Sequence, residues 1–260
     1  QGVGIDSARL DAEIILSHTL RHPRTYLHAH ADDVLDPRQL EIANARLDLR
    51  LERTPIAYII GHKEFYGHRF KVTTATLVPR PESEDMIDIL KDIVPNNLSL
   101  LPQTMRLVDV GTGSGCLGIT AKLEFPELDV TLLDTSIHAL NIAELNADSL
   151  EADVQCLKSN LLGGYPFSPD IILANLPYVD ISWDVSPETA AEPSEALYAG
   201  NGGLAVIDKM IVQASARLTP NGSLLLEADP RQHAEIIKTA KNYSFSVNEI
   251  RGFIICLQKD

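Results

Sequence analysis

The sequence is poor in cysteine and in basic charge, and each shortage excludes a class of protein. Three widely spaced cysteines in 260 residues cannot build a disulfide framework, so we interpret them as free thiols in a reducing compartment. Lys and Arg number 22 against 36 Asp and Glu, a net charge of −14. Such a field disfavours binding to phosphate backbones, so no direct contact with nucleic acid is expected.

Long apolar runs are also absent. No stretch reaches the roughly 18 apolar residues of a membrane span, and the N-terminus lacks the pattern of a secretory signal peptide. We therefore expect a cytoplasmic protein without membrane contact. Separately, we expect it to act as a monomer. His18 and His22 lack the acid or cysteine that would complete a metal site, so no metal is expected. The chain begins with Gln1 rather than Met, and we expect a trimmed N-terminus.

The sequence predicts three segments. Residues 1–60 show the spacing of three and four of amphipathic helices and form a small helical domain. Residues 61–78 include an alternating stretch around Gly67 and predict a linking β-hairpin. Residues 79–260 form the large domain, which we interpret as catalytic.

The large domain alternates strand, loop and helix from about residue 105. This alternation predicts an α/β fold with a mainly parallel sheet covered on both faces. The last two strands are joined by so short a link that they must be antiparallel. The predicted strands are 107–110, 130–134, 154–157, 171–174, 224–227, 244–249 and 253–257.

A glycine-rich loop follows the first of these strands. Asp109-Val-Gly-Thr-Gly-Ser-Gly115 ends the strand and opens a helix, where free backbone amides favour polar or anionic ligand groups. Asp134 ends the next strand, in position to accept hydrogen bonds from ribose hydroxyls. The overlapping stretch from Gly113 to Gly118 also fits the dinucleotide pattern G-x-G-x-x-G, so an NAD enzyme competes, as does a tight turn without a ligand.

A second motif, Asn175-Leu-Pro-Tyr178, follows the fourth strand, which is expected to neighbour the first. Asn175 offers an acceptor oxygen, and Pro177 holds Leu176 extended so that its carbonyl points outward as a second acceptor. Tyr178 adds a flat ring for stacking. Two acceptors and a ring suit a planar NH2 group, which an NAD enzyme does not need. A simple Asn-Pro turn is the alternative interpretation.

Together these motifs resemble the HemK/PrmC family of peptide-chain release factor glutamine methyltransferases, which are class I enzymes that use S-adenosylmethionine (SAM). The glycine loop is similar to their motif I, and Asn175–Tyr178 is similar to N-P-P-Y, with Leu176 in place of the first proline. Further stretches resemble the family in order along nearly the whole chain. They are Gly61–Gly67, Val78–Glu84, Glu192–Leu204 and Leu226–Gln232.

The resemblance implies a Rossmann-like class I methyltransferase with a seven-stranded sheet, in which the helical N-terminal domain docks the substrate. It implies Asn175, Leu176, Pro177 and Tyr178 as catalytic and substrate-binding residues, aided by Phe65 and Arg80. It implies a set of SAM-binding residues: Asp109, Gly111, Thr112, Gly113, Gly115, Asp134, Asn160 and Asn175.

The reaction that the resemblance implies is transfer of the SAM methyl group to the side-chain amide nitrogen of the glutamine in the Gly-Gly-Gln motif of a release factor. S-adenosylhomocysteine would be the product. Two alternatives remain: an N6-adenine methyltransferase of nucleic acids, which uses a similar tetrapeptide, and a SAM-binding protein without catalytic activity, which the change to Leu176 would favour.

Overall fold

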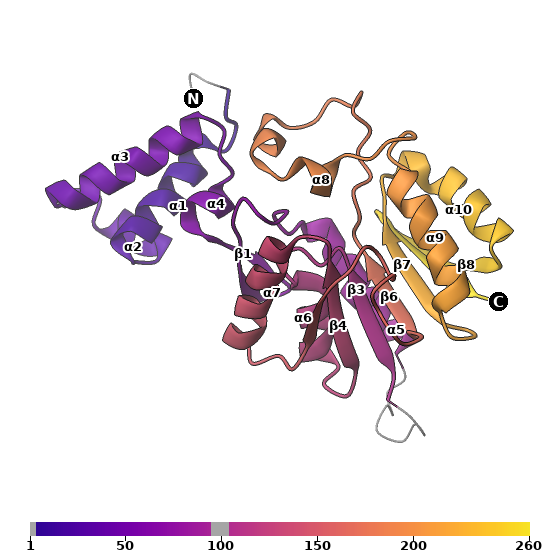
Figure 1. Cartoon of the computed structure of the whole chain (residues 1–260). Helices are drawn as coiled ribbons and strands as arrows, with labels where there is room; N and C mark the ends of the chain where they lie inside the picture. The colour runs from indigo at the N-terminus through magenta and orange to yellow at the C-terminus, as the bar shows by residue number, and fades with distance from the viewer. Residues whose placement is uncertain (1–3, 95–103) are drawn as a thin grey trace. The chain divides into compact units, whose positions relative to one another are not determined.

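A computed structural model describes residues 4–94 and 104–260, and the chain divides into two compact units (Figure 1). The first unit comprises Gln1–His62 together with Val185–Ala191, and the second comprises Lys63–Asp184 together with Glu192–Asp260. The segment boundaries proposed from the sequence, at residues 60 and 78, stay a prediction. No sequence feature indicated that Val185–Ala191 belongs with the N-terminal helices.

The first unit is helical, as predicted. Its longest helix begins with a capping box, in which Asp36 Oδ1 accepts from the amides of Arg38 and Gln39 at 2.9 and 3.4 Å while Gln39 Oε1 accepts from the Asp36 amide at 3.2 Å. Its apolar stripe is only partly buried, since Leu40 keeps 49% of its surface exposed. The helices are α1 (Ala8–Leu20), α2 (Arg24–Ala29), α3 (Pro37–Leu51) and α4 (Ile56–Ile60).

A buried arginine joins distant parts of the first unit. Arg50 on α3 donates to Asp11 on α1 at 2.7 Å and to Glu188 at 3.0 Å, and it is 8% exposed. Removing one partner of a buried ion pair leaves a buried charge uncompensated, so all three side chains matter to this arrangement. This contact explains why the 185–191 segment belongs to the helical unit.

The linking hairpin forms where the alternating pattern predicted it. Strands β1 (His62–Phe65) and β2 (His68–Lys71) are joined by Tyr66 and Gly67, both with positive φ, as a tight hairpin turn requires. Phe65 and Phe70 pack edge to face with ring centroids 6.2 Å apart, and both are buried.

The second unit contains a seven-stranded sheet in the order β5-β4-β3-β6-β7-β9-β8. All pairs are parallel except those of β9 with β7 and β8, so the predicted antiparallel end is confirmed. The strands are β3 (Arg106–Val110), β4 (Asp129–Asp134), β5 (Gln155–Lys158), β6 (Ile171–Ala174), β7 (Ser223–Glu227), β8 (Phe245–Arg251) and β9 (Ile254–Lys259).

Helices cover both faces of this sheet, as expected for a parallel sheet (Figure 1). Buried side chains of β3 alternate between the two faces: Val108 joins the core under α9 and α10, and Leu107 joins the core under α5, α6 and α7. The helices are α5 (Glu84–Ile93), preceded by the 3-10 turn η1 (Pro81–Ser83), α6 (Cys116–Glu124), α7 (Ile137–Ser149), α8 (Ser194–Leu197), α9 (Ala205–Arg217) and α10 (His233–Asn242). Two further 3-10 turns are η4 (Pro230–Gln232) in this unit and η3 (Pro187–Ala191) in the first unit.

The strand order reverses between β3 and β6. The chain runs outward from β3 through β4 to β5 and then returns to the other side of β3, where Val110 pairs with Ala174. Ligands of open α/β sheets bind at the carboxyl ends of strands at such a switch point. The predicted neighbourhood of the glycine loop and the Asn175 motif is therefore confirmed. Within residues 4–94 and 104–260, no helix combines the length and apolar composition of a membrane span.

Candidate active site

A cavity of about 500 Å³ lies at this switch point, entirely within the second unit. Pockets for small ligands usually measure roughly 300–1,000 Å³. The wall combines apolar side chains with a few polar groups. The predicted residues that line it are Gly111, Thr112, Gly113, Asp134, Asn160, Asn175, Leu176 and Pro177.

The glycine loop is held by backbone hydrogen bonds, two of them to strand β4. The amides of Gly111 and Thr112 donate to the carbonyl of Leu133 at 2.8 and 3.0 Å, and the Gly115 amide donates to the carbonyl of Thr112 at 2.8 Å. Gly115 has φ +84°, and a Cβ there would stand 2.6 Å from Ile119 Cδ1. The positive φ is the reason that glycine is favoured here, and an added Cβ would also force the Ile119 side chain to move.

Asp109 supports this loop from below and does not line the cavity. Its Oδ2 accepts from Thr112 Oγ1 at 2.6 Å and from the Gly118 amide at 2.9 Å, and the residue is 1% exposed. Burial raises the pKa of the carboxyl to about 6, although both hydrogen bonds oppose the shift. Asp109 and Gly115 therefore shape the loop, and their predicted part in binding the methyl donor stays a prediction.

Asp134 and Asn160 line the cavity after β4 and β5. Asp134 Oδ2 accepts from the Gly113 amide at 3.0 Å, and Oδ1 accepts from the Ser136 amide at 2.9 Å. Each carboxylate oxygen can accept more than one hydrogen bond, so Asp134 keeps free capacity for the hydroxyls of a ligand. Asn160 is exposed at the cavity edge.

Asn175 is the first residue after β6, and its amide nitrogen is bound to two side chains of the protein. Nδ2 donates to Ser83 Oγ at 3.1 Å and to Glu227 Oε2 at 3.0 Å. Both hydrogens of the NH2 group are thereby used. Oδ1 accepts no hydrogen bond from the residues that the structure describes, so it is available to a ligand.

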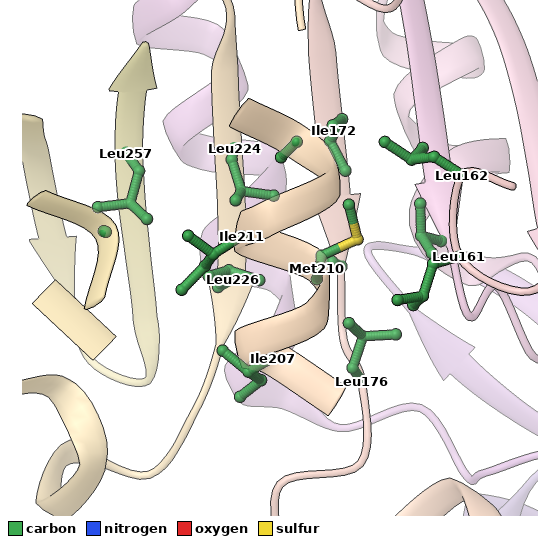
Figure 2. Packing of buried hydrophobic residues seen from close by; sticks show 14 of the residues in the cluster. Leu161, Leu162, Ile172, Leu176, Ile207, Met210, Ile211, Leu224, Leu226 and Leu257 are labelled. Atoms are coloured by element: carbon green, nitrogen blue, oxygen red, sulfur yellow. The ribbon is translucent and has the colours of Figure 1, made fainter. Parts of the chain in front are cut away.

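Leu176 is anchored by its side chain in the core. It is 4% exposed and belongs to the hydrophobic cluster under α9, where Figure 2 shows it at the end of β6 close to Met210 and Leu161. A Cβ on Gly111 would stand 3.1 Å from Leu176 Cδ2, so the glycine loop and the tetrapeptide are in contact. Burial of the leucine side chain thus fixes the backbone at this position, where the N-P-P-Y motif has its first proline.

Tyr178 lies beside the cavity wall rather than in it. Its hydroxyl donates to Glu227 Oε1 at 3.2 Å, and its carbonyl accepts from Gln232 Nε2 at 2.8 Å. Burial, followed by the neighbouring Glu227 charge, raises the pKa of the Tyr178 hydroxyl above its usual range. The ring is therefore a neutral, fixed surface.

Phe65 and Arg80 also lie outside the cavity lining. Phe65 is 1% exposed in the core that contains α5, so its contribution is to packing. Arg80 donates to Glu192 at 2.5 Å, and Glu192 also accepts from the Val78 amide at 3.1 Å. Glu192 thereby ties the stretch before η1 to the segment that follows Ala191.

Sequence reasoning assigned no role to Ser83 and Glu227, yet both contact Asn175. Glu227 closes β7, a strand whose other residues after Ser223 are all leucine. A lone acid at the end of an apolar strand, at the ligand-binding edge of the sheet, is the signal that could have identified it. Ser83 lies in the stretch Val78–Glu84, which resembles the family, but no neighbouring residue in the sequence indicates that it contacts Asn175.

Comparison with known proteins gives matches along the chain. Residues 1–61 match the PrmC N-terminal domain, and residues 83–192 match the methyltransferase small domain. A release factor glutamine methyltransferase from Koribacter versatilis is 35% identical over 95% of this chain and 89% of its own length. One from Deinococcus radiodurans is 33% identical over 88% of this chain and 81% of its own length.

Among solved structures, the fold is similar to that of a methyltransferase from Pyrococcus furiosus. The TM-score is 0.54 at 19% identity, with 83% of this chain and 95% of the other covered. This likeness confirms the predicted class I methyltransferase fold.

Proposed function

This chain belongs to the release factor glutamine methyltransferase family, and on that premise we propose that it methylates the side-chain amide nitrogen of the glutamine in the Gly-Gly-Gln motif of a peptide-chain release factor. The observation that carries the proposal is the state of Asn175. Its NH2 group is fully used inside the protein, which leaves Oδ1 as an acceptor in the cavity wall.

The cavity fits SAM as methyl donor. The positive-φ glycine loop brings the backbone of Gly111–Gly113 to the wall, and Asp134 keeps acceptor capacity for ribose hydroxyls. Apolar side chains such as Leu161 offer a surface for a base, with Asn160 at its edge. When bound, SAM supplies an electrophilic methyl group on a sulfonium sulfur.

The protein's task is to orient the acceptor. An amide nitrogen is a weak nucleophile because its lone pair is delocalised. Hydrogen bonds from the substrate NH2 to Asn175 Oδ1 and to the Leu176 carbonyl would direct that lone pair and stabilise the positive charge that develops on nitrogen. Correct orientation contributes roughly 7–11 kcal/mol in favourable cases. No strong base is required, since the proton can leave after transfer.

We also propose that the helical segment 1–60 docks the protein substrate. The proposal is supported by the match of residues 1–61 to the PrmC N-terminal domain.

Tritiated methyl transfer from SAM to purified release factor tests the function. We expect labelling of the intact factor and none when its Gly-Gly-Gln glutamine is changed to alanine. Labelling that survives this change, or label that appears only on DNA or RNA offered in parallel, would overturn the proposal.

A further inference from the structure

Glu227 is a carboxylate at the end of a strand that is otherwise fully buried and largely leucine. It is 2% exposed, and three donors converge on it. Oε2 accepts from Ser83 Oγ and from Asn175 Nδ2, and Oε1 accepts from the Tyr178 hydroxyl. Burial raises the pKa of this carboxyl, and the donors from Ser83 and Tyr178 oppose that rise. A buried carboxylate whose donors are all satisfied holds those donor side chains in one arrangement.

When Glu227 is ionised, the three contacts have only one consistent set of donors and acceptors. An ionised carboxylate can only accept, so Ser83 must give it its single hydroxyl hydrogen. The Ser83 oxygen then has only acceptor capacity left for Asn175. Both neighbours of the Asn175 amide are therefore acceptors, and the amide must turn its NH2 group toward them.

The opposite amide orientation would be unfavourable. Asn175 Oδ1 would then face the Glu227 carboxylate, acceptor against acceptor, and the NH2 group would face the cavity. An NH2 group in the cavity wall would repel the NH2 group of a substrate amide, because both are donors. The orientation of one amide thus decides whether the wall accepts or rejects an NH2 group.

We propose that Glu227, acting with Ser83, is the positioning residue that fixes the amide orientation of Asn175 and so selects substrates that present an NH2 group. The inference rests on the proposed function. Glu227 acts through Asn175 and is not among the residues that line the cavity.

The first test is Glu227→Met, which keeps chain length but removes both acceptors. We expect kcat on release factor to fall about tenfold or more, since small losses of orientation have large effects on rate. KM for release factor and the Kd for S-adenosylhomocysteine by calorimetry should stay within about twofold. The melting temperature should fall, because Ser83, Asn175 and Tyr178 lose their common acceptor, so kcat is measured well below the melting temperature of the variant. Unchanged kcat, or a loss of kcat accompanied by equally weakened binding of S-adenosylhomocysteine, would overturn the proposal.

The second test exchanges the polarity of the pair. Asn175→Asp alone sets two carboxylates against each other and should lose activity, because one of them must be held protonated or repel the other. Adding Glu227→Gln supplies an NH2 group that donates to one oxygen of the introduced carboxylate and leaves its other oxygen free for substrate. The double variant should therefore be about tenfold more active than Asn175→Asp, whereas a purely structural Glu227 predicts no recovery.

A matched control combines Asn175→Asp with Glu192→Gln. Glu192 is another buried carboxylate of the same unit, but its partners are Arg80 and Val78 rather than Asn175. Equal recovery in this control would mean that net charge, not hydrogen-bond polarity, is responsible, and would overturn the inference.

The wild-type enzyme is assayed beside these variants. If it does not methylate the glutamine of release factor, the proposed function itself fails; if it does and the variants behave otherwise than expected, only the positioning role fails.

Discussion

The carboxyl ends of β3 and β6 are neighbours in the sheet, but they are held by different means. After β3, the glycine loop is fixed by backbone hydrogen bonds and by positive-φ glycines, above the buried Asp109. After β6, the tetrapeptide is fixed by side chains: Asn175 by Ser83 and Glu227, and Leu176 by the core.

The difference separates two kinds of recognition. The end of β3 offers a ligand mostly backbone groups. The position of these groups depends on the backbone conformation of the loop, so many substitutions of neighbouring side chains should leave it unchanged. The end of β6 offers one side-chain oxygen and one backbone carbonyl. The orientation of these two acceptors depends on the residues that contact Asn175 and Leu176. Substitutions at the two ends should therefore affect binding of the methyl donor and turnover separately.

Asn175→Ala should have the largest effect on turnover, because it removes the side-chain acceptor at the end of β6. Removal of a single group that stabilises developing charge typically lowers kcat by about 10²–10³-fold, so turnover should be nearly abolished. Binding of SAM, measured by calorimetry, should persist because the β3 end is intact. Loss of SAM binding, or full activity, would contradict the role assigned to Asn175.

Leu176→Ala tests whether core packing holds the second acceptor. Removal of a buried leucine side chain should lower the free energy of unfolding by about 2–5 kcal/mol in urea titrations and should also lower kcat. Leu224→Ala, in the same cluster but away from the cavity, is the matched control. It should lose similar stability and keep kcat; an equal loss of kcat would show that Leu176 acts only through stability.

Asp109→Asn tests the β3 end through pH. The carboxyl titrates near 3.8 when unfolded and at about 6 in the fold, so between these values the folded protein holds an extra proton. The free energy of unfolding of the wild type should therefore fall, relative to that of the variant, as pH rises through this window, by on the order of 3 kcal/mol. Urea titrations at pH 4 and pH 8 measure this change. A stability gap that does not vary with pH would mean that the charge is not buried as described.

Asp134→Ala should give the smallest effect and should act on affinity. The loss of a charged acceptor for hydroxyls is expected to raise the Kd for SAM about tenfold, or roughly 1.4 kcal/mol. At saturating SAM, kcat should change little, since the β6 end is untouched. A large fall in kcat with unchanged affinity would show that the two ends are not separable.

The sequence predicted the topology because strand and helix periodicity are local signals, and the switch-point rule then placed Asp109–Gly115 beside Asn175–Tyr178. It did not predict how side chains pair across long separations. The contact of Asn175 with Ser83 spans 92 positions, and that of Arg80 with Glu192 spans 112. Phe65 shows the same limit, since alternation places it on a strand but cannot say that its face is turned into the core.

The Arg50 contact has a consequence for synthesis of the chain. Arg50 and Glu188 are 138 positions apart, although they belong to one compact unit. At translation rates of roughly 5–20 residues per second, the ribosome needs roughly 7–28 seconds to make the intervening chain. The N-terminal helices therefore leave the ribosome well before Glu188 is made, and their buried arginine waits for its second partner while the chain between them is synthesised.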